Sequence, residues 1–302
     1  MTAIGLDIGG TKIEMQVFGP DWALIARDRA PTPRDYPALL GAVAALVAAA
    51  ERAGGRAPVG ISAAGLVDRR SGLAMTSNLP ATGRPFPADL AARIGRPVAF
   101  INDCRAMALS EARLGAGRGA ATVLGLVLGT GVGSGFVQNG VAAEGATGIS
   151  GEIGHIALPA PLIQRHGLPI LRCGCGRTGC FETLVSGPGL ARIADHLTGR
   201  SLTAPQIVAL RGSDPGMARV WSVWCGLVAE LLVSAILTLD PEVIVLGGGL
   251  SGVDGICDDL TTAMAQAHLV GLALPRLCVA EGGDATGARG AALAATQLDI
   301  PE

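Results

Sequence analysis

Residues 150–182 of the chain read SGEIGHIALPAPLIQRHGLPILRCGCGRTGCFE and contain four metal-binding side chains, His155, Cys173, Cys175 and Cys180. Zinc binds four nitrogen or sulfur donors in a tetrahedron, and three thiolates with one imidazole form a closed, structural site. The C-x-C-x4-C spacing lets one glycine-rich turn wrap around the ion, while His155 completes the set from further upstream. The alternative is three neighbouring reduced cysteines and an unrelated core histidine. Clustered cysteines with a companion histidine favour zinc.

A carboxylate lies just outside each end of this set of ligands, at Glu152 and Glu182. A fully coordinated zinc ion has no open position for a water molecule, so we expect a structural ion rather than a catalytic one. Such a site would fix the backbone between the two glutamates, which could then hold a polar ligand. The chemistry is therefore expected elsewhere in the chain.

The composition restricts the class of protein. A chain of 302 residues is long enough for two domains, and 49% hydrophobic with 16% charged residues excludes wholesale disorder. A net charge of −2 without a basic run disfavours nucleic acid as a partner. The apolar runs Ala38–Ala50 and Leu227–Leu239 are too short to span a bilayer. Only two residues precede the first expected strand, so we expect no signal peptide. Reduced cysteines then indicate a cytoplasmic protein without a membrane partner.

Two glycine-rich hairpins occupy equivalent places in the two halves of the chain. An apolar strand, 3–9, leads through Gly9-Gly10-Thr11-Lys12 into a strand at 13–18, and 121–128 leads through the glycine-rich run 129–135 into 136–138. Glycines let backbone N–H groups close on an anion. A single such hairpin could equally be an ordinary tight turn with a solvated lysine. Two of them predict a duplicated α/β fold that holds one polyphosphate from both sides.

A third glycine-rich segment, Gly247-Gly248-Gly249, follows an expected strand at 242–246 and precedes an expected helix at 253–269. A strand, glycines and a helix N-terminus in this order form a site for an anion or a nucleotide. The spacing is not that of the dinucleotide fingerprint, so a nicotinamide cofactor is disfavoured.

The dipeptide Asn102-Asp103 lies between an expected strand at 97–101 and an expected helix at 104–114. An aspartate at the carboxyl end of a strand in an α/β sheet lies where ligands bind. It could also be the N-cap of the following helix. Both roles can hold together.

Taken together, these segments resemble the ROK family of sugar kinases. The resemblance rests on DIGGTK at 7–12, ND…ALSE at 102–111, LGTGVGSG at 128–135, GEIGH at 151–155, CGCGRTGCFE at 173–182 and VIVLGGG at 243–249. Within the family, the long spacer between His155 and Cys173 and the segments PTPRD and APQIVAL most resemble bacterial N-acetylglucosamine kinases, with the fructokinase/mannokinase branch second.

The resemblance implies a duplicated actin/hexokinase-like (ribonuclease H-like) α/β ATPase fold with two domains and a cleft. The small domain would comprise residues 1–117 together with a C-terminal helix at 285–302, and the larger domain 118–284 would carry the zinc motif. The resemblance also implies a homodimer.

The resemblance further implies an ATP-dependent kinase for a hexose hydroxyl, the 6-hydroxyl of N-acetylglucosamine first, with Asp103 as general base. The sugar would bind to Asn78, Asn102, Asp103, Glu152, His155 and Glu182. Asp7 would hold Mg²⁺, and the phosphates of ATP would lie against Gly9, Gly10, Thr11, Lys12, Thr130, Gly131 and Gly133. Gly247, Gly248 and Gly249 would line the adenosine pocket, and Zn²⁺ would bind His155, Cys173, Cys175 and Cys180.

Other functions on the same fold are a fructokinase, a mannokinase, a glucokinase, or a kinase for a polyol or cyclitol. A repressor of the family is disfavoured because no helix-turn-helix precedes Asp7. A non-catalytic sugar-binding protein is disfavoured because Asp103 and the phosphate glycines are present.

The sequence departs from the family pattern at two places. Ala64 stands where a proline usually precedes the glycine, and Cys104-Arg105 stands where Ala-Asn usually follows the aspartate. We interpret Arg105 as a solvated helix residue. Alternatively, it meets an anionic or otherwise unusual substrate.

Overall fold

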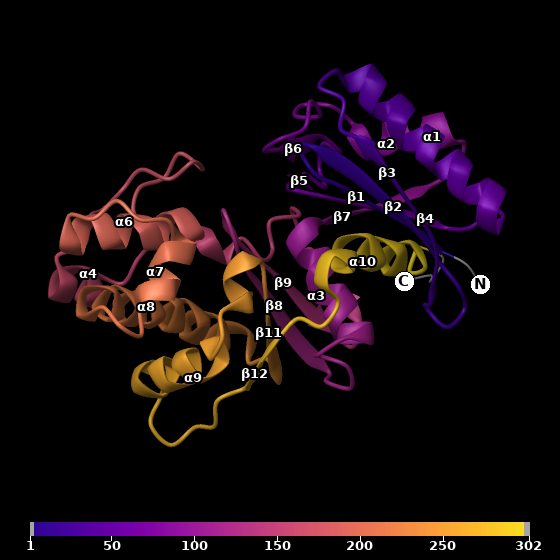
Figure 1. Cartoon of the computed structure of the whole chain (residues 1–302). Coiled ribbons are helices and arrows are strands. Elements are labelled where there is room, and N and C mark those ends of the chain that lie inside the picture. Colours follow the sequence, from indigo (N-terminus) through magenta and orange to yellow (C-terminus); the bar gives the residue numbers. More distant parts are fainter. Residues whose placement is uncertain (1–2, 299–302) are drawn as a thin grey trace. The chain divides into compact units, whose positions relative to one another are not determined.

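A computed structural model describes residues 3–298 of the chain (Figure 1). Over this range the chain divides into two compact units. Unit 1 comprises residues 3–119, 135–151 and 281–298, and unit 2 comprises 120–134 and 152–280. The expected C-terminal helix at 285–302 is present as α10 (Thr286–Ala295), and its last four positions lie outside the described residues.

The sheet of unit 1 is mixed and has the strand order β3-β2-β1-β4-β7. Strands β1 (Ala3–Ile8), β2 (Lys12–Phe18) and β3 (Leu24–Pro31) pair antiparallel, whereas β4 (Val59–Ala63) and β7 (Val98–Asn102) run parallel to β1. The carboxyl ends of parallel strands meet at one edge of a sheet. The turn after β1 and the dipeptide Asn102-Asp103 therefore share that edge.

Alternation along β1 directs its side chains to two different helix layers. Ile4, Leu6 and Ile8 are buried in a core with α1 (Tyr36–Gly54) and α2 (Phe86–Ile94), whereas Gly5 faces α10 on the other side (Figure 1). A Cβ atom on Gly5 would lie 1.8 Å from the carbonyl oxygen of Ala288. Helix α10 thus packs on the sheet backbone to backbone, which leaves no room for a side chain at position 5.

Helix α3 (Asp103–Leu114) packs beside α10 with a similarly close approach. A Cβ atom on Gly290 of α10 would lie 1.9 Å from the carbonyl oxygen of Ala106. Since α3 begins directly after β7, this packing fixes the start of α3 at the carboxyl edge of the sheet.

The second five-stranded sheet repeats the pattern with the order β10-β9-β8-β11-β12. Its strands are β8 (Thr122–Leu128), β9 (Val132–Gln138), β10 (Val141–Ala142), β11 (Val243–Gly247) and β12 (Arg276–Val279). Strand β11 pairs parallel with both β8 and β12. The predicted duplication is therefore confirmed in the topology: in each sheet a hairpin edge is followed by two parallel strands.

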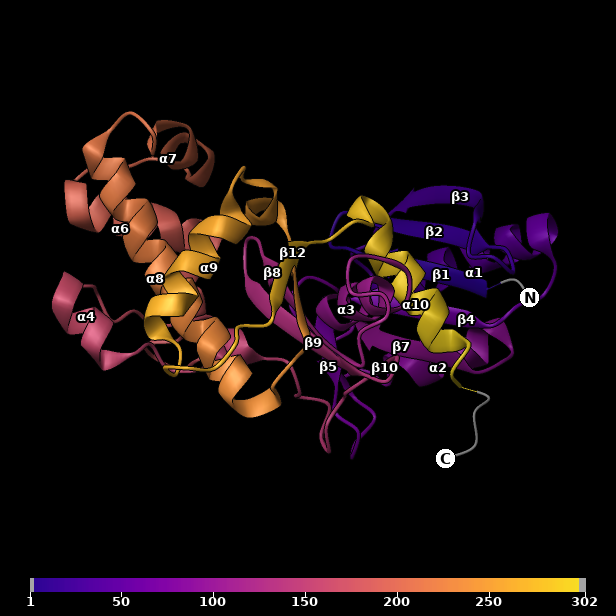
Figure 2. The same cartoon turned by 90° about the horizontal axis from the view of Figure 1, so that it is seen from below.

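Helices make up most of the rest of unit 2: α4 (Ala160–His166), α5 (Glu182–Val185), α6 (Gly187–Thr198), α7 (Ala204–Leu210), α8 (Pro215–Leu239) and α9 (Ile256–Ala267). Helices α8 and α9 lie side by side (Figure 2). Helix α8 has 25 residues, and its most apolar window has a mean hydropathy of 2.0. By length and composition it could therefore cross a membrane, contrary to the expectation from the shorter run 227–239. However, 72% of that window is buried inside the structure, as in the core helix of a globular domain.

The structure corrects several expected elements. Strand β9 begins at Val132 rather than at 136, so Gly133 and Gly135 belong to a strand and not to a turn. The segment between His155 and Cys173 contains the unexpected helix α4. The expected helix at 253–269 is present in shorter form as α9, and a 3-10 turn, η2 (Gly249–Gly252), precedes it. Two further short strands, β5 (Gly65–Val67) and β6 (Ala74–Thr76), pair antiparallel.

Candidate active site

The first part of the candidate site is the start of α3 in unit 1. Asn102 is the N-cap: its Oδ1 accepts hydrogen bonds from the backbone N–H groups of Cys104 and Arg105 at 3.0 and 3.2 Å. Its Nδ2 donates to the carbonyl oxygen of Gly65 at 3.1 Å. The capping role therefore belongs to Asn102, and Asp103 is the first residue of the helix. Burial raises the pKa of the Asp103 carboxyl above its usual value, which makes the ionised group a stronger base.

Asp7 lies on β1 directly opposite Glu14 of β2. The pKa of Asp7 is raised to about 6, chiefly by burial and further by the negative charges of Asp103 and Glu14. Two other carboxylates thus disfavour the ionised form of Asp7. A cation bound to Asp7 would relieve this repulsion, and a carboxylate oxygen is a ligand that a hard divalent cation such as Mg²⁺ accepts.

We predict that Asp7→Asn stabilises the magnesium-free protein in a pH-dependent way. Because the folded-state pKa is raised from 3.8 to about 6, the folded protein loses stability as the pH rises through this interval. The variant lacks that loss, so its free energy of unfolding should exceed that of the wild type by about 1–3 kcal/mol at pH 8 and by nothing below pH 4. Urea denaturation in magnesium-free buffer at several pH values measures this.

The control for this prediction is Asp28→Asn, which removes an exposed aspartate from β3 of the same unit. It should leave the pH dependence of unfolding unchanged. A stability difference between Asp7→Asn and wild type that is the same at pH 4 and pH 8 would contradict the prediction.

The turn after β1 is closed by hydrogen bonds of its own. The N–H of Gly9 donates to the carbonyl oxygen of Lys12 at 2.9 Å, so this N–H is used inside the turn. A Cβ atom on Gly10 would lie 3.1 Å from Cβ of Asn78, which places Asn78 beside the turn. A small cavity of about 330 Å³ is lined by Gly10, Pro33, Arg34, Asn78 and Pro80. The structure thus brings Asn78 and the DIGGTK motif together, and it adds Arg34, which the sequence reasoning missed.

In unit 2, Glu182 connects the second glycine-rich turn with the cysteine cluster. Its Oε2 accepts a hydrogen bond from the backbone N–H of Val132 at 3.0 Å, and its Oε1 lies 3.6 Å from Sγ of Cys173. A Cβ atom on Gly131 would lie 2.9 Å from Glu182 Oε2, which places the Glu182 carboxylate directly beside the turn. Glu182 begins α5 and remains half-buried.

A cavity of about 900 Å³ in unit 2 contains two of the predicted nucleotide-binding residues, Thr130 and Gly249. This volume is in the range of small-molecule sites. Gly247 and Gly248 do not line it. Gly248 has φ of 83°, and a Cβ atom there would lie 2.5 Å from the carbonyl oxygen of Leu128, so that glycine serves a close backbone approach.

The sequence reasoning missed most of the residues that line this cavity. They belong to the start of α6, to α7 and its two caps, and to η2 and the turn after it, and include Pro188, Thr203, Val208, Arg211, Leu250 and Asp254. The available signal was the segment APQIVAL, which forms α7.

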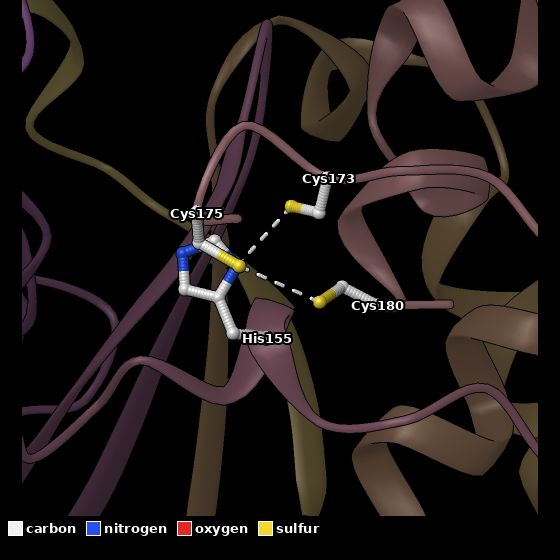
Figure 3. Close-up of side chains that lie close together, drawn as sticks. All are labelled: His155, Cys173, Cys175 and Cys180. Atoms are coloured by element: carbon white, nitrogen blue, oxygen red, sulfur yellow. Dashed lines mark hydrogen bonds between the residues drawn. The ribbon is translucent and has the colours of Figure 1, made fainter. Parts of the chain in front are cut away.

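The four predicted metal ligands come together in unit 2 (Figure 3). Their ligand atoms all lie within 4.8 Å of one another. Sγ of Cys175 is 3.7 Å from Sγ of Cys180, and Sγ of Cys173 is 3.6 Å from Nδ1 of His155. A tetrahedral zinc ion with Zn–S bonds of about 2.3 Å and Zn–N bonds of about 2.0–2.1 Å requires separations of about 3.8 and 3.6 Å for these two kinds of pair. The donor set and its spacing therefore fit zinc.

The backbone around the cysteines explains why this loop is rich in glycine. Gly176 and Gly179 have φ angles of 90° and 75°, in the left-handed region that glycine adopts without strain. The N–H of Cys173 donates to the carbonyl oxygen of Arg177 at 2.8 Å and closes the turn. Arg177 in turn donates from Nη1 to the carbonyl oxygen of His155 at 2.9 Å, which ties the distant histidine to the cysteine loop.

The second nitrogen of His155 points toward another predicted site residue. Nε2 lies 3.6 Å from Oε2 of Glu152, while Nδ1 faces the thiol of Cys173. A metal bound at Nδ1 would leave Nε2 as an N–H donor on the side of Glu152. The cluster thus orients both side chains.

Comparison with known proteins identifies the family. The profile of the ROK family matches residues 3–298. The chain belongs to the ROK family. It is 43% identical over 300 residues to an N-acetylgalactosamine kinase of Shewanella sp. (strain ANA-3), covering 98% of this chain and 97% of that protein. It is 42% identical over 296 residues to an N-acetyl-D-glucosamine kinase of Shigella boydii, covering 95% and 97% of the two chains.

Solved ROK structures agree with this fold. A ROK hexokinase from Thermus thermophilus matches with a TM-score of 0.87 and 35% identity over 98% of both chains. A ROK family glucokinase from Streptomyces griseus, solved in complex with glucose and AMPPNP, matches with a TM-score of 0.77 and 28% identity, covering 98% of this chain and all of that one.

The structure corrects our interpretation of one departure from the ROK pattern. Arg105 is not a solvated helix residue, because its side chain is only 5% exposed. Its guanidinium group donates to backbone carbonyl groups of Gly148 and Ser150. Ala64, the other departure, lies between β4 and β5 and is half-buried.

Proposed function

We propose that this ROK protein is an ATP-dependent kinase that phosphorylates a hydroxyl group of an N-acetylhexosamine, with the 6-hydroxyl of N-acetylglucosamine as the first candidate. The observation that carries the proposal is the full-length similarity, at 43% and 42% identity, to two kinases for N-acetylhexosamines. The site residues predicted from the sequence supply the groups that this reaction needs.

Asp103 is the proposed general base. It would accept the proton of the sugar hydroxyl while the hydroxyl oxygen bonds to the γ-phosphorus of ATP and ADP leaves. Its position in the first turn of α3, held by the Asn102 cap, orients the carboxylate. Burial raises the pKa of the Asp103 carboxyl and thereby makes the carboxylate a stronger base.

Asn78, Asn102, Glu152, His155 and Glu182 are the proposed sugar-binding residues. A pocket that pairs sugar hydroxyls with such groups rejects analogues that lack them, because its polar groups are then left unpaired. Asn102 uses its oxygen for the cap, and its Nδ2 donates to the carbonyl oxygen of Gly65 and interacts with the Asp103 carboxylate, which places it beside the proposed base. Nε2 of His155, beside Glu152, is the proposed donor on the other unit.

ATP is proposed to bind with its phosphates at the two glycine-rich turns, at Gly9, Gly10, Thr11, Lys12, Thr130, Gly131 and Gly133, and its adenosine in the cavity of about 900 Å³. Asp7 would hold a magnesium ion, whose role is to neutralise phosphate charge. Gly249 would line the adenosine pocket, with Gly247 and Gly248 shaping the backbone behind it. The proposal places the sugar and ATP in a cleft that closes to exclude water.

Zinc is the proposed ion of the His155–Cys173–Cys175–Cys180 cluster, in a structural role. The proposal also includes a cytoplasmic location, a homodimer, and no membrane or nucleic-acid partner.

One specific observation favours a second substrate. The N-acetylgalactosamine kinase of Shewanella shares as much identity with this chain as the N-acetylglucosamine kinase does. The two sugars share the acetamido group and differ in the orientation of the 4-hydroxyl. N-acetylgalactosamine is therefore the second candidate acceptor.

The test is ADP release by the purified protein with Mg-ATP and a panel of sugars: N-acetylglucosamine, N-acetylgalactosamine, N-acetylmannosamine, glucose, mannose and fructose. We expect the highest kcat/KM with an N-acetylhexosamine, and no turnover above background in Asp103→Ala. Higher kcat/KM with fructose, mannose or glucose would move the protein to another branch of the family. No turnover with any of these sugars would refute the proposal.

A further inference from the structure

Arg105 makes contacts that neither the proposed reaction nor the family resemblance accounts for. Its Nε donates to the carbonyl oxygen of Ser150 at 3.0 Å, and its Nη2 lies 2.5 Å from the carbonyl oxygens of both Gly148 and Ser150. Hydrogen bonds from a charged guanidinium group are strong and directional. All these acceptors are backbone atoms of one short segment. These contacts are thus to the protein's own chain.

The segment that Arg105 holds is also fixed from its other side. Gly148 has φ of 89°, and a Cβ atom there would lie 2.5 Å from the carbonyl oxygen of Val67 in β5. Residues 148–150 are therefore packed between the first turn of α3 and the β5 strand of unit 1.

The held segment leads directly into two proposed sugar-binding residues. Unit 1 ends at Gly151 and unit 2 resumes at Glu152, which is followed by the 3-10 turn η1 (Ile153–His155). Arg105 thus fixes the last residues before the chain passes into the segment that bears Glu152 and His155. It does so from the helix whose first residue is Asp103.

Helix α3 holds the other passages between the units as well. Glu111, fully buried, accepts hydrogen bonds from the N–H groups of Ala116, Glu281 and Gly282 at 3.0, 3.0 and 2.9 Å. These residues precede and follow the passages at 119/120 and 280/281. The passage at 134/135 is held by packing, since a Cβ atom on Gly135 would lie 2.6 Å from Cα of Arg105. Within unit 1, the chain is therefore anchored to α3 at each passage.

We propose that Arg105 is a positioning residue for sugar binding. By fixing the carbonyl groups of residues 148 and 150, it restricts the backbone conformations of residues 151–155 and so pre-orients Glu152 and His155. Pre-orientation lowers the cost of ordering this segment when the sugar binds. The inference rests on the proposed function, because it needs Glu152 and His155 to contact the sugar.

The first test uses Arg105→Asn, which places the usual family residue at this position, and Arg105→Lys, which keeps the charge but not the planar fork of donors. Steady-state kinetics are measured with the sugar varied at saturating ATP and with ATP varied at saturating sugar. We expect the KM for the sugar to rise about tenfold in Arg105→Asn, as for the loss of a charge-assisted hydrogen bond, and to recover in part in Arg105→Lys. The KM for ATP should stay unchanged.

The matched control is Arg113→Asn. Arg113 is on the same helix and also donates to a backbone carbonyl oxygen, that of Gly140 at 3.4 Å. This contact is exposed, and Gly140 lies outside the segment 148–150 that leads into Glu152. Both KM values should be unchanged in this variant. A rise of both KM values in Arg105→Asn would indicate a general structural defect and overturn the proposal.

A second test asks whether Arg105 acts through Glu152. In the double variant Arg105→Asn/Glu152→Gln, the sugar KM should exceed that of Glu152→Gln by a smaller factor than Arg105→Asn produces in the wild type, because one of the two groups that Arg105 orients has already been altered. Multiplicative effects of the two changes would overturn the proposal.

Hydrogen–deuterium exchange provides a readout that does not depend on turnover. Amides of residues 151–156 should exchange faster in Arg105→Asn than in wild type, whereas the exchange of α3 amides should be unchanged. Arg105→Lys should show the same change to a smaller extent, and it replaces Arg105→Asn in this test if the asparagine variant does not fold. Faster exchange with an unchanged sugar KM would leave Arg105 with a role in loop stability alone and overturn the proposal. Wild-type protein without turnover on any sugar would instead refute the proposed function, on which this inference rests.

Discussion

Replacing Asp103 by asparagine is expected to lower kcat by about 10²- to 10⁴-fold, the usual contribution of a positioned general base. Asparagine has nearly the same shape as aspartate but cannot accept a proton at neutral pH. The cap of α3 is made by Asn102, so it remains intact in this variant. The KM for the sugar should change far less than kcat, because proton removal is needed in the transition state rather than for binding. ADP release at saturating sugar and ATP measures kcat.

The control for this prediction is Asp35→Asn, in the same unit. Asp35 is the N-cap of α1 and accepts a hydrogen bond from the N–H of Ala38 at 3.0 Å. Asparagine caps helices about as well as aspartate, so this variant should keep full activity. A kcat within about threefold of wild type in Asp103→Asn would rule out general-base catalysis by Asp103 and require another base.

Loss of the metal from the His155–Cys173–Cys175–Cys180 cluster is expected to destabilise the protein by several kcal/mol. Metal binding contributes directly to folding where the unfolded chain has no preformed site, and structural zinc supplies roughly 10–16 kcal/mol in small zinc domains. In a unit with its own apolar core, only part of this free energy is needed for folding. Without an ion, burial raises the pKa of the Cys173 thiol to about 12. Zinc would reverse this by binding the thiolate.

Cys175→Ser tests this prediction with little change to packing, because Cys175 is the exposed member of the cluster. Metal analysis should find one zinc per chain in wild type and much less in the variant, with a lower midpoint of thermal unfolding. Cys257→Ser, a cysteine of α9 outside the cluster, is the control and should retain the metal. Protein purified without metal yet as stable as zinc-loaded protein would contradict a structural role.

If zinc fills the cluster as proposed, its removal should also weaken sugar binding, because an ion bound at Nδ1 would fix the orientation of His155 with Nε2 beside Glu152. If the cluster supports only the fold, Cys175→Ser should lower the stability without changing the KM for the sugar. The two measurements on Cys175→Ser thus distinguish a site that supports the fold from one that also orients the ligand side chains.

Several features of the fold and of the candidate site were predictable because they depend on residues close together in the chain. An apolar run predicted the strand that leads into Gly9-Gly10-Thr11-Lys12, and the repeat of a glycine-rich hairpin predicted the duplicated topology that the two sheets confirm. The C-x-C-x4-C spacing with its glycines predicted the turn that gathers Cys173, Cys175 and Cys180. In each case, local backbone preferences and ligand spacing are properties of a few consecutive residues.

Other features depend on which distant segments pack together, and only the tertiary structure decided them. Arg105 reads as a surface helix residue, but its environment is set by residues 148–150, more than forty positions later. Likewise, Gly133 and Gly135 read as turn residues, yet they continue β9, and Gly135 is required because α3 approaches it closely. The membership of residues 135–151 in unit 1 is equally absent from local patterns. Local preferences select helix, strand or turn, whereas burial and hydrogen-bond partners are assigned only when the chain closes on itself.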